Sequence, residues 1–323
     1  MDNLTHSLVG ALLGQAGLKK KTGLAMPALI IGANLPDVDA ACFFWLEGQE
    51  HLGFRRGITH GPPAMVLLPL ILAGLLWGYD RWQAKRGARP EGRLRVHFGW
   101  LYALSFIGCL THPALDWLNV YGVRFLEPFS SQWFFGDTLF IIDVWLWALM
   151  GFATWFSLWR EKAGGDWMKP ARVAIAVSLT YVGVNGVISE FARSTAGEMV
   201  FVRSQEAIAS PVPLWFWQRE ILAPTFKHEH NWLVAHHPQS ISHRGRLLSE
   251  HICDFDAAVS QTASNSELDA FLFWTRAPFA ERAEDGSVLL RDARFYDPRV
   301  RDRFSVALPD VKCEPLNQEH SGG

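Results

Sequence analysis

Long runs of apolar residues dominate the first 190 positions of the chain. Pro63–Tyr79 and Val173–Ser189 contain no charged residue, and Leu139–Trp159 contains one. Crossing the hydrocarbon core of a bilayer takes about 17–25 apolar residues, so these three runs are long enough to span it as helices. The apolar runs near residues 8, 24 and 98 are shorter or interrupted. Soluble helices carry a polar stripe and these runs carry none, so we expect a mainly α, polytopic membrane helical bundle over residues 1–190.

The chain after about residue 190 has a different composition. Residues 191–323 hold many charged residues and most of the histidines. Short runs bounded by Pro, Gly, Asn and Asp predict strands at Met199–Val202, Trp232–Ala235, Val288–Tyr296 and Phe304–Leu308. We therefore expect a smaller, mainly β (α+β) soluble domain over residues 191–315, followed by a flexible tail at 316–323.

Positive charges alternate between the loops that join the apolar runs. Loops rich in Lys and Arg stay on the cytoplasmic side of a membrane. Three loops are rich in these residues, at 19–21, 81–95 and 160–172. The segments 47–62 and 119–138, and everything after about residue 190, then lie outside, so we predict an extracytoplasmic C-terminal domain.

The overall composition averages these two unlike parts. The 323 residues carry a net charge of −2, and 19% of them are charged, whereas about 25% is usual for a soluble domain. A near-neutral chain without a basic face is not expected to bind nucleic acid. Cys42 and Cys109 fall in apolar runs and are expected to be small core residues. Cys253 and Cys313 could pair in an oxidising compartment.

Ionisable residues are few inside the apolar half, where each is costly to bury. In chain order they are His6, Asp37, Asp39, His60, His112, Asp116, Asp137 and Asp143. In the predicted topology all but the deeper Asp143 fall at the outer ends of the apolar segments, so we expect them to meet at one depth near the outer interface. For Asp137 the alternative is a helix N-cap, and Asp143 could serve only to brace the site.

Three of these histidines follow a threonine, in Thr5-His6, Thr59-His60 and Thr111-His112. Chance predicts roughly 0.4 such pairs for this composition. The repeated pair suggests a threonine hydroxyl that hydrogen-bonds the neighbouring ligand. The alternative is that threonine only packs there.

Two motifs offer carboxylates beside these histidines. His112 and Asp116 are four residues apart, which places both on one face of a helix, and Pro113 fits the first turn of such a helix. Asp37 and Asp39 follow a proline that ends any incoming helix. Two carboxylates so close need a positive charge to stay ionised, which a metal would supply. The alternative for them is a solvated turn in which one aspartate caps a helix.

The segment that presents His60 also carries an arginine. Gly57 and Gly61 suit a tight loop around His60, and Arg56 is placed to bind a phosphate or an aspartate; the alternative is that it binds lipid head groups. Histidine and aspartate without thiolate favour a catalytic ion, zinc first and manganese second. More than four candidate ligands allow one or two ions, the latter sharing a bridging carboxylate.

Several motifs in this order resemble the YdjM-type family of membrane-bound, metal-dependent hydrolases. They are His6, LPDVD at 35–39, RGITH at 56–60, THPALDWLNVYG at 111–122 and GDTLFIIDVWLW at 136–147. The resemblance covers about residues 1–190. It implies a multi-pass protein of the bacterial inner membrane, distantly similar to zinc phospholipase C and S1/P1-type nucleases. The metal ligands that it implies are His6, one of Asp37 and Asp39, His60, His112 and Asp116, the last as the bridging carboxylate.

The first functional hypothesis is a membrane-bound metal-dependent hydrolase. A metal-activated water would cleave a phosphoester or similar bond of a lipid-like substrate at the outer membrane interface. Asp37, Asp137 or Asp143 would act as base or further ligand. Arg56 would clamp the anion. Two alternatives stay open: an ion or small-solute transporter with broken helices, and a non-catalytic membrane scaffold or receptor.

Overall fold

The computed structural model describes residues 1–198, 202–226, 229–237, 246–249 and 251–315. The predicted tail at 316–323 lies outside them. The chain forms two compact units. The first comprises Met1–Ala40, Arg56–Val187 and Pro211–Phe216, and the second comprises Ala41–Arg55, Ile188–Ser210 and Trp217–Gly323. The main boundary falls near residue 190. Two short segments depart from it, because 41–55 belongs to the second unit and 211–216 belongs to the first.

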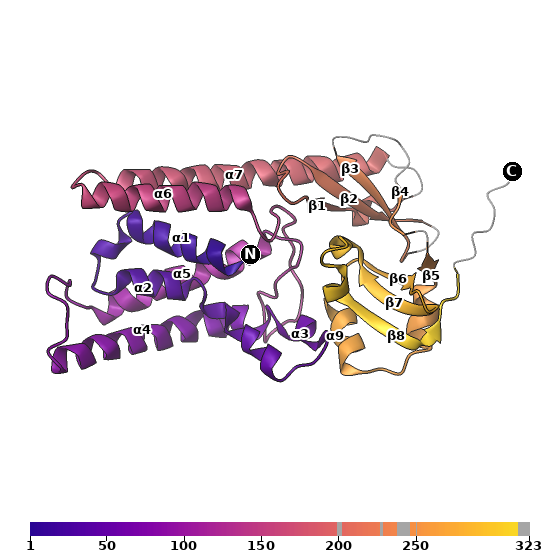
Figure 1. Ribbon diagram of the computed structural model, residues 1–323, viewed down its shortest axis with the longest axis horizontal. Coiled ribbons are helices and arrows are strands. Elements are labelled where there is room, and N and C mark those ends of the chain that lie inside the picture. The colour runs from indigo at the N-terminus through magenta and orange to yellow at the C-terminus, as the bar shows by residue number, and fades with distance from the viewer. Residues whose placement is uncertain (199–201, 227–228, 238–245, 250, 316–323) are drawn as a thin grey trace. The chain divides into compact units, whose positions relative to one another are not determined.

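The first unit is a bundle of helices. They are α1 (Asn3–Gln15), α2 (Ala25–Gly32), α4 (Pro62–Lys85), α5 (Phe98–Trp117), α6 (Val144–Lys162) and α7 (Met168–Thr195). Helix α5 packs against α2 and α4, and α1 packs against α2 and α6, so the helices form successive layers (Figure 1). Asp2 caps α1 and Asp143 caps α6, because each carboxylate accepts hydrogen bonds from backbone N–H groups of the first turn.

Three of these helices, α4, α5 and α7, are long and apolar enough to cross a membrane. Leu75 on α4 is 67% exposed and Val187 on α7 is 71% exposed, as expected of helices that are apolar on every side. The predicted span at 139–159 is not among them, because α6 begins only after Asp143 and ends in Arg160 and Lys162. The interrupted run near residue 98 instead forms the full-length α5.

A further apolar segment is broken in the middle. Helix α2 ends at Gly32, and the 3₁₀ segment η2 (Leu35–Phe44) follows it at an angle of 52°. Together the two are long and apolar enough for one broken span or a re-entrant loop. Pro36 lies at the start of η2, which confirms the predicted helix end. Irregular backbone at membrane depth is tolerated where protein buries it or where it lines a cavity, and this break introduces Asp37.

Three glycines allow α1, α2 and α5 to approach closely. A Cβ on Gly10 would lie 2.7 Å from the carbonyl oxygen of Leu29, and one on Gly108 would lie 2.6 Å from the same oxygen. A Cβ on Gly32 would lie 2.7 Å from the carbonyl oxygen of Ser105. Small residues are what lets membrane helices pack backbone to backbone. These glycines therefore fix the distance at which α1 and α5 flank α2.

The second unit contains two four-stranded antiparallel sheets, as the strand-like runs predicted. The first sheet has the order β1 (Ile208–Pro211), β2 (Arg219–Pro224), β3 (Trp232–His237) and β4 (Arg246–Leu247), and the second has the order β5 (Ile252–Cys253), β6 (Pro278–Arg282), β7 (Ser287–Asp292) and β8 (Ser305–Lys312). The predicted run at 288–296 is a strand only to Asp292 and then turns into a 3₁₀ segment. The run predicted at 199–202 lies mostly outside the described residues.

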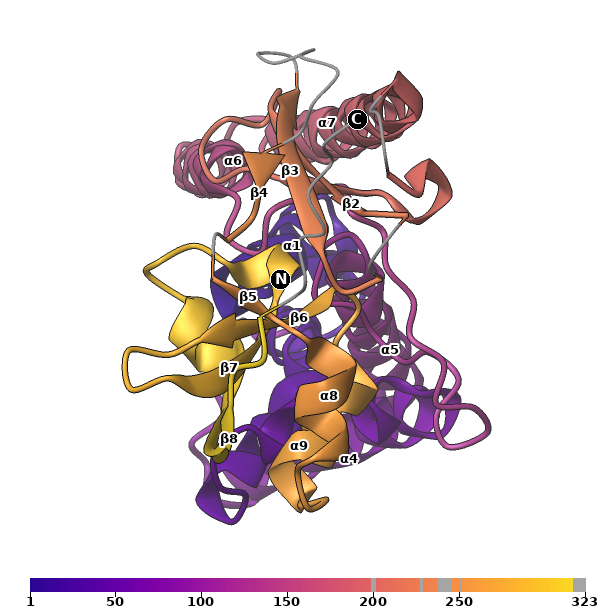
Figure 2. The ribbon, with the colours of Figure 1, turned by 90° about the vertical axis from the view of Figure 1, so that its right-hand side faces the viewer.

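Three short helices complete the second unit. Helices α8 (Phe255–Ser260) and α9 (Ser266–Trp274) lie against the second sheet (Figure 2), and α3 (Glu50–Phe54) packs against α9. The two sheets share a core that includes Trp232 and Phe279. The Trp232 indole N–H donates to the carbonyl oxygen of Pro278 at 3.0 Å, so one side chain joins the two sheets by packing and by a hydrogen bond.

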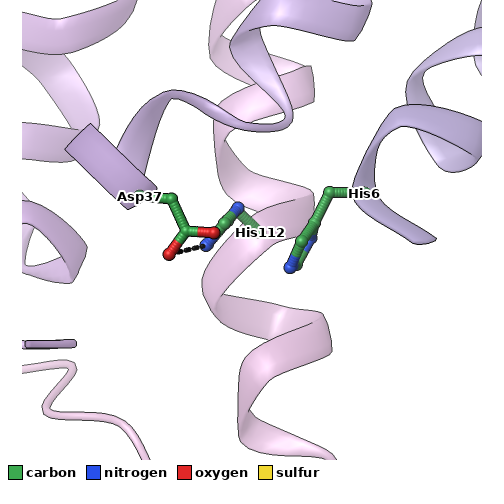
Figure 3. A group of neighbouring side chains, drawn as sticks. All are labelled: His6, Asp37 and His112. Atoms are coloured by element: carbon green, nitrogen blue, oxygen red, sulfur yellow. Dashed lines mark ion pairs between the residues drawn. The ribbon is translucent and has the colours of Figure 1, made fainter. Parts of the chain in front are cut away.

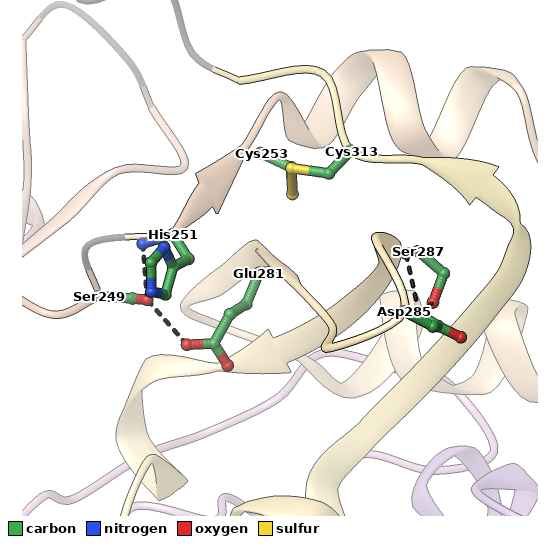
Figure 4. The surroundings of a disulfide bond; sticks show 7 residues. All are labelled: Ser249, His251, Cys253, Glu281, Asp285, Ser287 and Cys313. Carbon is green, nitrogen blue, oxygen red and sulfur yellow. Dashed lines mark hydrogen bonds between the residues drawn. A yellow bond between two sulfur atoms is a disulfide. The ribbon is translucent and has the colours of Figure 1, made fainter.

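A disulfide joins Cys253 on β5 to Cys313, which follows β8 (Figure 4). It closes a loop of 60 residues, and such a cross-link stabilises a small domain by restricting its unfolded chain. Cys42 and Cys109 are buried and form no disulfide, as predicted for small core residues. The two cysteines next to strands of the second sheet are therefore paired, whereas the two in apolar segments of the N-terminal half form no disulfide.

Because a Cβ at Gly108 would overlap the Leu29 carbonyl oxygen, we expect Gly108→Ala to lower the free energy of unfolding by about 1–3 kcal/mol, the usual cost of overpacking. Gly74→Ala on α4 is the matched control, since a Cβ there meets no atom within 4 Å. Its better helix propensity should leave stability equal or higher. Thermal unfolding in detergent micelles compares the two variants, and equal stability would contradict the close packing of α2 and α5.

Candidate metal centre

Polar side chains from four segments of the first unit meet at one buried place. His6 comes from α1, Asp37 from η2, His60 from a short 3₁₀ turn, and His112 and Asp116 from α5. The three histidines and Asp116 are at most 1% exposed. Figure 3 shows the His112 ring between Asp37 and His6, and the His6 and His112 rings stack with centroids 3.7 Å apart.

Two overlapping groups in this cluster have metal-ligand spacing. In each group the ligand atoms lie within 4.8 Å of one another. The groups are His6, Asp37 and His112, and His60, His112 and Asp116. The convergence that the sequence predicted for these five residues is therefore present, whereas their binding of a metal stays a prediction.

The Asp116 carboxylate is the centre of the cluster. Its oxygens lie 3.5 Å from His6 Nε2, 3.4 Å from His60 Nε2 and 3.5 Å from His112 Nε2. Arg56 Nε also lies 3.0 Å from Oδ2, and the amino group of Met1 contacts Oδ1. A buried carboxylate requires such partners of opposite charge. This single carboxylate also faces three imidazole rings at once.

Hydrogen bonds on the far side of two rings orient them. His112 Nδ1 lies 2.7 Å from the carbonyl oxygen of Ala33, which only accepts, so Nδ1 donates there, and in the neutral ring Nε2 carries the lone pair. Thr59 Oγ1 lies 3.1 Å from Asp39 Oδ2 and 2.9 Å from His60 Nδ1. The hydroxyl donates to the carboxylate and accepts from the ring, which leaves His60 Nε2 with its lone pair as well. This outer bonding is what metal-binding histidines show.

The cluster fits a cation better than it fits a set of hydrogen bonds. Both ring nitrogens of His6 and the Nε2 atoms of His60 and His112 are buried and have no hydrogen-bond partner. Buried polar atoms without a partner are rare. Burial also lowers the pKa of His60, which favours the neutral ring that a metal requires. Imidazole and carboxylate donors without thiolate suit zinc or manganese.

The two aspartates of the LPDVD motif have different surroundings. Asp37 Oδ1 lies 3.7 Å from His112 Nε2, within a ligand group. Asp39 Oδ2 instead accepts hydrogen bonds from the backbone N–H of Arg56 at 2.8 Å and from Thr59 Oγ1 at 3.1 Å. Arg56 has a φ of +55°, which is uncommon for a residue other than glycine. Asp37 is thus the candidate ligand of the pair, and Asp39 fastens the turn that presents His60.

Arg56 is buried beside the cluster and bonded to protein groups. Its Nη1 donates to Asn119 Oδ1 at 3.0 Å and to the Gly122 carbonyl oxygen at 3.2 Å. Its guanidinium also lies 4.5 Å from the ring centroid of Tyr121. These contacts support a role in positioning Asp116, and the predicted clamping of an anion stays a prediction. Asn119 was not among the predicted site residues, although a polar residue in the apolar stretch after Asp116 was a usable signal.

Asp137 and Asp143 lie outside both ligand groups. Asp137 is buried in the loop before α6 with a φ of +47°. Asp143, not Asp137, is the N-cap of α6, and its Oδ2 accepts a hydrogen bond at 3.0 Å from Tyr181 on α7. Asp143 therefore braces two helices, in line with the weaker of its two predicted roles.

The three Thr-His pairs do not share one geometry. Among the described contacts, Thr59 is the threonine that bonds the ring of its histidine. Thr5 Oγ1 instead donates to Asp2 at 2.6 Å, and Thr111 Oγ1 donates to the Gly108 carbonyl oxygen at 2.6 Å.

The predicted place of Pro113 in the first turn of a helix is wrong, because α5 continues through it. A proline removes one backbone donor, and membrane helices tolerate that loss.

A family model described as YdjM inner membrane protein matches residues 1–192. Comparisons with curated proteins and with solved structures returned no match. The matched range covers the helices of the first unit and every residue of the cluster, and it ends close to where strands replace helices.

Asn119→Leu removes the acceptor for Arg56 Nη1 and for the backbone N–H of Tyr121. We expect it to lower the free energy of unfolding by about 1.5–3 kcal/mol, as for a hydrogen bond to a charged group. Asn119→Asp keeps an acceptor in the same place and should retain most of the stability. Denaturant unfolding in micelles measures both; a leucine variant as stable as the unmodified protein would show that Asn119 does not hold Arg56.

Proposed function

Because the chain belongs to the family of YdjM inner membrane proteins, we propose that its helical half is a multi-pass membrane domain with a metal-dependent hydrolase site. The site is the cluster around Asp116. Its substrate is lipid-like and is cleaved at a phosphoester or similar bond near the outer membrane interface.

The observation that carries this proposal is the set of buried imidazole nitrogens without hydrogen-bond partners beside Asp116. Ionisable groups inside a membrane protein are costly and mark functional sites. A purely structural cluster would be expected to pair its donors with its acceptors. In this cluster four ring nitrogens are left over, and all belong to residues that the family resemblance implies as ligands.

A divalent ion at such a site lowers the pKa of a bound water and stabilises developing negative charge. His6, His60, His112, Asp37 and Asp116 would hold one ion or two. The chain's own groups do the rest. Arg56 holds the Asp116 carboxylate at 3.0 Å, and the Ala33 carbonyl fixes the His112 ring.

Asp37 is the member of the cluster nearest to solvent, because its side chain is 11% exposed whereas those of His112 and Asp116 are almost fully buried. A substrate would therefore reach the cluster from the side of η2. Asp137 and Asp143 have structural roles in this proposal.

The C-terminal domain is proposed to lie outside the cytoplasm. Two independent features support this orientation. Lys and Arg concentrate in the segments 19–21, 81–95 and 160–172, which the positive-inside rule places in the cytoplasm. The Cys253–Cys313 disulfide belongs to the β domain, and disulfides persist in oxidising compartments such as the bacterial periplasm.

One observation favours a second function, transport of an ion or small solute. The bent pair of α2 and η2 carries Asp37 close to its break, and transporters often build ion sites on discontinuous helices. Ion flux in proteoliposomes by a protein that holds no metal would select this second function over hydrolysis.

The hydrolase proposal predicts that protein purified without chelators contains about one or two transition-metal ions per chain, with zinc as the main one. His112→Ala should lose most of this metal, because His112 belongs to both ligand groups. Elemental analysis after gel filtration measures the ratio of metal to protein.

His97→Ala serves as the matched control, since His97 is exposed and precedes α5 outside the cluster. This variant should keep the full metal content. Unmodified protein without stoichiometric metal, or equal metal in the two alanine variants, would overturn the proposed site.

The proposed orientation predicts the number of free thiols in the protein taken directly from cells. Denatured without reductant, the chain should react with a polymer-linked maleimide at Cys42 and Cys109 alone, and after reduction at all four cysteines. Cys253→Ser should expose one thiol more without reductant, since its partner is released. Four reactive thiols in the unreduced protein would indicate a β domain in the reducing cytoplasm.

A further inference from the structure

The helical unit contains an apolar cavity of about 300 Å³ among α1, α5, α6 and α7. Its lining is made almost entirely of aliphatic side chains, among them Val9, Leu115 and Met150. Thr111 and Ser178 are the exceptions, and the Thr111 hydroxyl is already bonded within α5. A lining of this kind offers nothing to a polar ligand and suits a hydrocarbon chain.

The lining of the cavity includes residues from the turns of α5 that carry the His/Asp cluster, although no residue of the cluster itself lines it. Thr111 and Leu115 line it from positions next to His112 and Asp116 in α5. Val9 and Leu13 line it from positions three and seven residues after His6, which lie on the same face of α1. The cavity therefore extends along α1 away from His6, deeper into the helical bundle.

The cavity also opens between helices. Leu179 on α7 lines it and is 68% exposed. Helix α7 is one of the three helices that are long and apolar enough to span a membrane, so this side faces hydrocarbon in the bilayer. A lipid chain could enter sideways without passing through water.

We propose that this cavity holds one acyl chain of a membrane phospholipid whose head group lies at the His/Asp cluster. Its volume is at the lower end of ligand pockets, about 300–1,000 Å³, so it accommodates one chain and not two. The placement of the head group rests on the proposed hydrolase function, whereas the binding of the chain does not.

The test uses the full-length protein in phosphatidylglycerol vesicles that contain a phosphatidylglycerol with a diazirine in one acyl chain. After illumination, mass spectrometry locates the labelled peptides. Ala114→Phe and Ser178→Leu enlarge two side chains of the lining. Ala176→Phe is the matched control, because Ala176 is exposed on α7 and does not line the cavity. Melting temperatures confirm that each variant is folded.

We expect labelling of the peptides that carry Leu115 and Met150, a loss of about tenfold in folded Ala114→Phe and Ser178→Leu, and no loss in Ala176→Phe. Equal labelling in all three variants would overturn the proposal, because the label would then report surrounding lipid. His112→Ala should keep the label while losing metal. If the cavity is labelled but the protein has no hydrolase activity, the proposed hydrolase function is wrong and the binding of the acyl chain stands. If the protein is a hydrolase but the cavity variants are labelled like the unmodified protein, only the binding of the acyl chain is wrong.

Discussion

The structure of the helical unit depends on one buried charge, the carboxylate of Asp116. A carboxylate at this depth is tolerated only if the surrounding segments bring partners to it. Arg56 and His60 approach it from the turn after α3, His6 approaches it from α1, and His112 approaches it from α5. These segments come from distant parts of the sequence. The hydrophobic effect does not drive helices together inside a lipid bilayer. The contacts that Asp116 requires therefore help to align these segments.

Helix packing supplies the distances that this charge requires. The carbonyl oxygen of Ala33 reaches His112 Nδ1 at 2.7 Å only because α2 and α5 are close enough for Gly108 to touch the Leu29 carbonyl. Larger residues at Gly108 or Gly32 would move the helices apart by about the size of a methyl group, and the ring of His112 would lose the bond that sets its tautomer. The geometry of the cluster therefore depends on these glycines, because the close approach of the helix backbones positions the polar side chains.

The sequence predicted the cluster because polar residues are conspicuous in an apolar chain. His6, His60, His112 and Asp116 could be chosen for that reason alone, and the structure brings them together. The sequence could not separate Asp37 from Asp39, since their different partners depend on the φ of Arg56 and on Thr59, which are set by tertiary structure. It also could not place the start of α6. Asp143 lies within an apolar run, yet it is the N-cap, so the helix begins only after it. The β domain was predictable as a class, but not the pairing of Cys253 with Cys313, which needs the register of strands 60 residues apart.

The exchange of the segment 41–55 into the second unit has a consequence for how the protein is made. The backbone N–H of Gln49 donates to Glu267 at 3.0 Å, across 218 residues of chain, and α3 packs against α9. At about 5–20 residues per second, a ribosome needs roughly 10–40 s to synthesise the chain between these two residues. During that interval α3, in the segment 41–55, has no α9 to pack against. Biogenesis of this protein therefore includes a waiting state in which α3 lacks its packing partner until α9 has been synthesised.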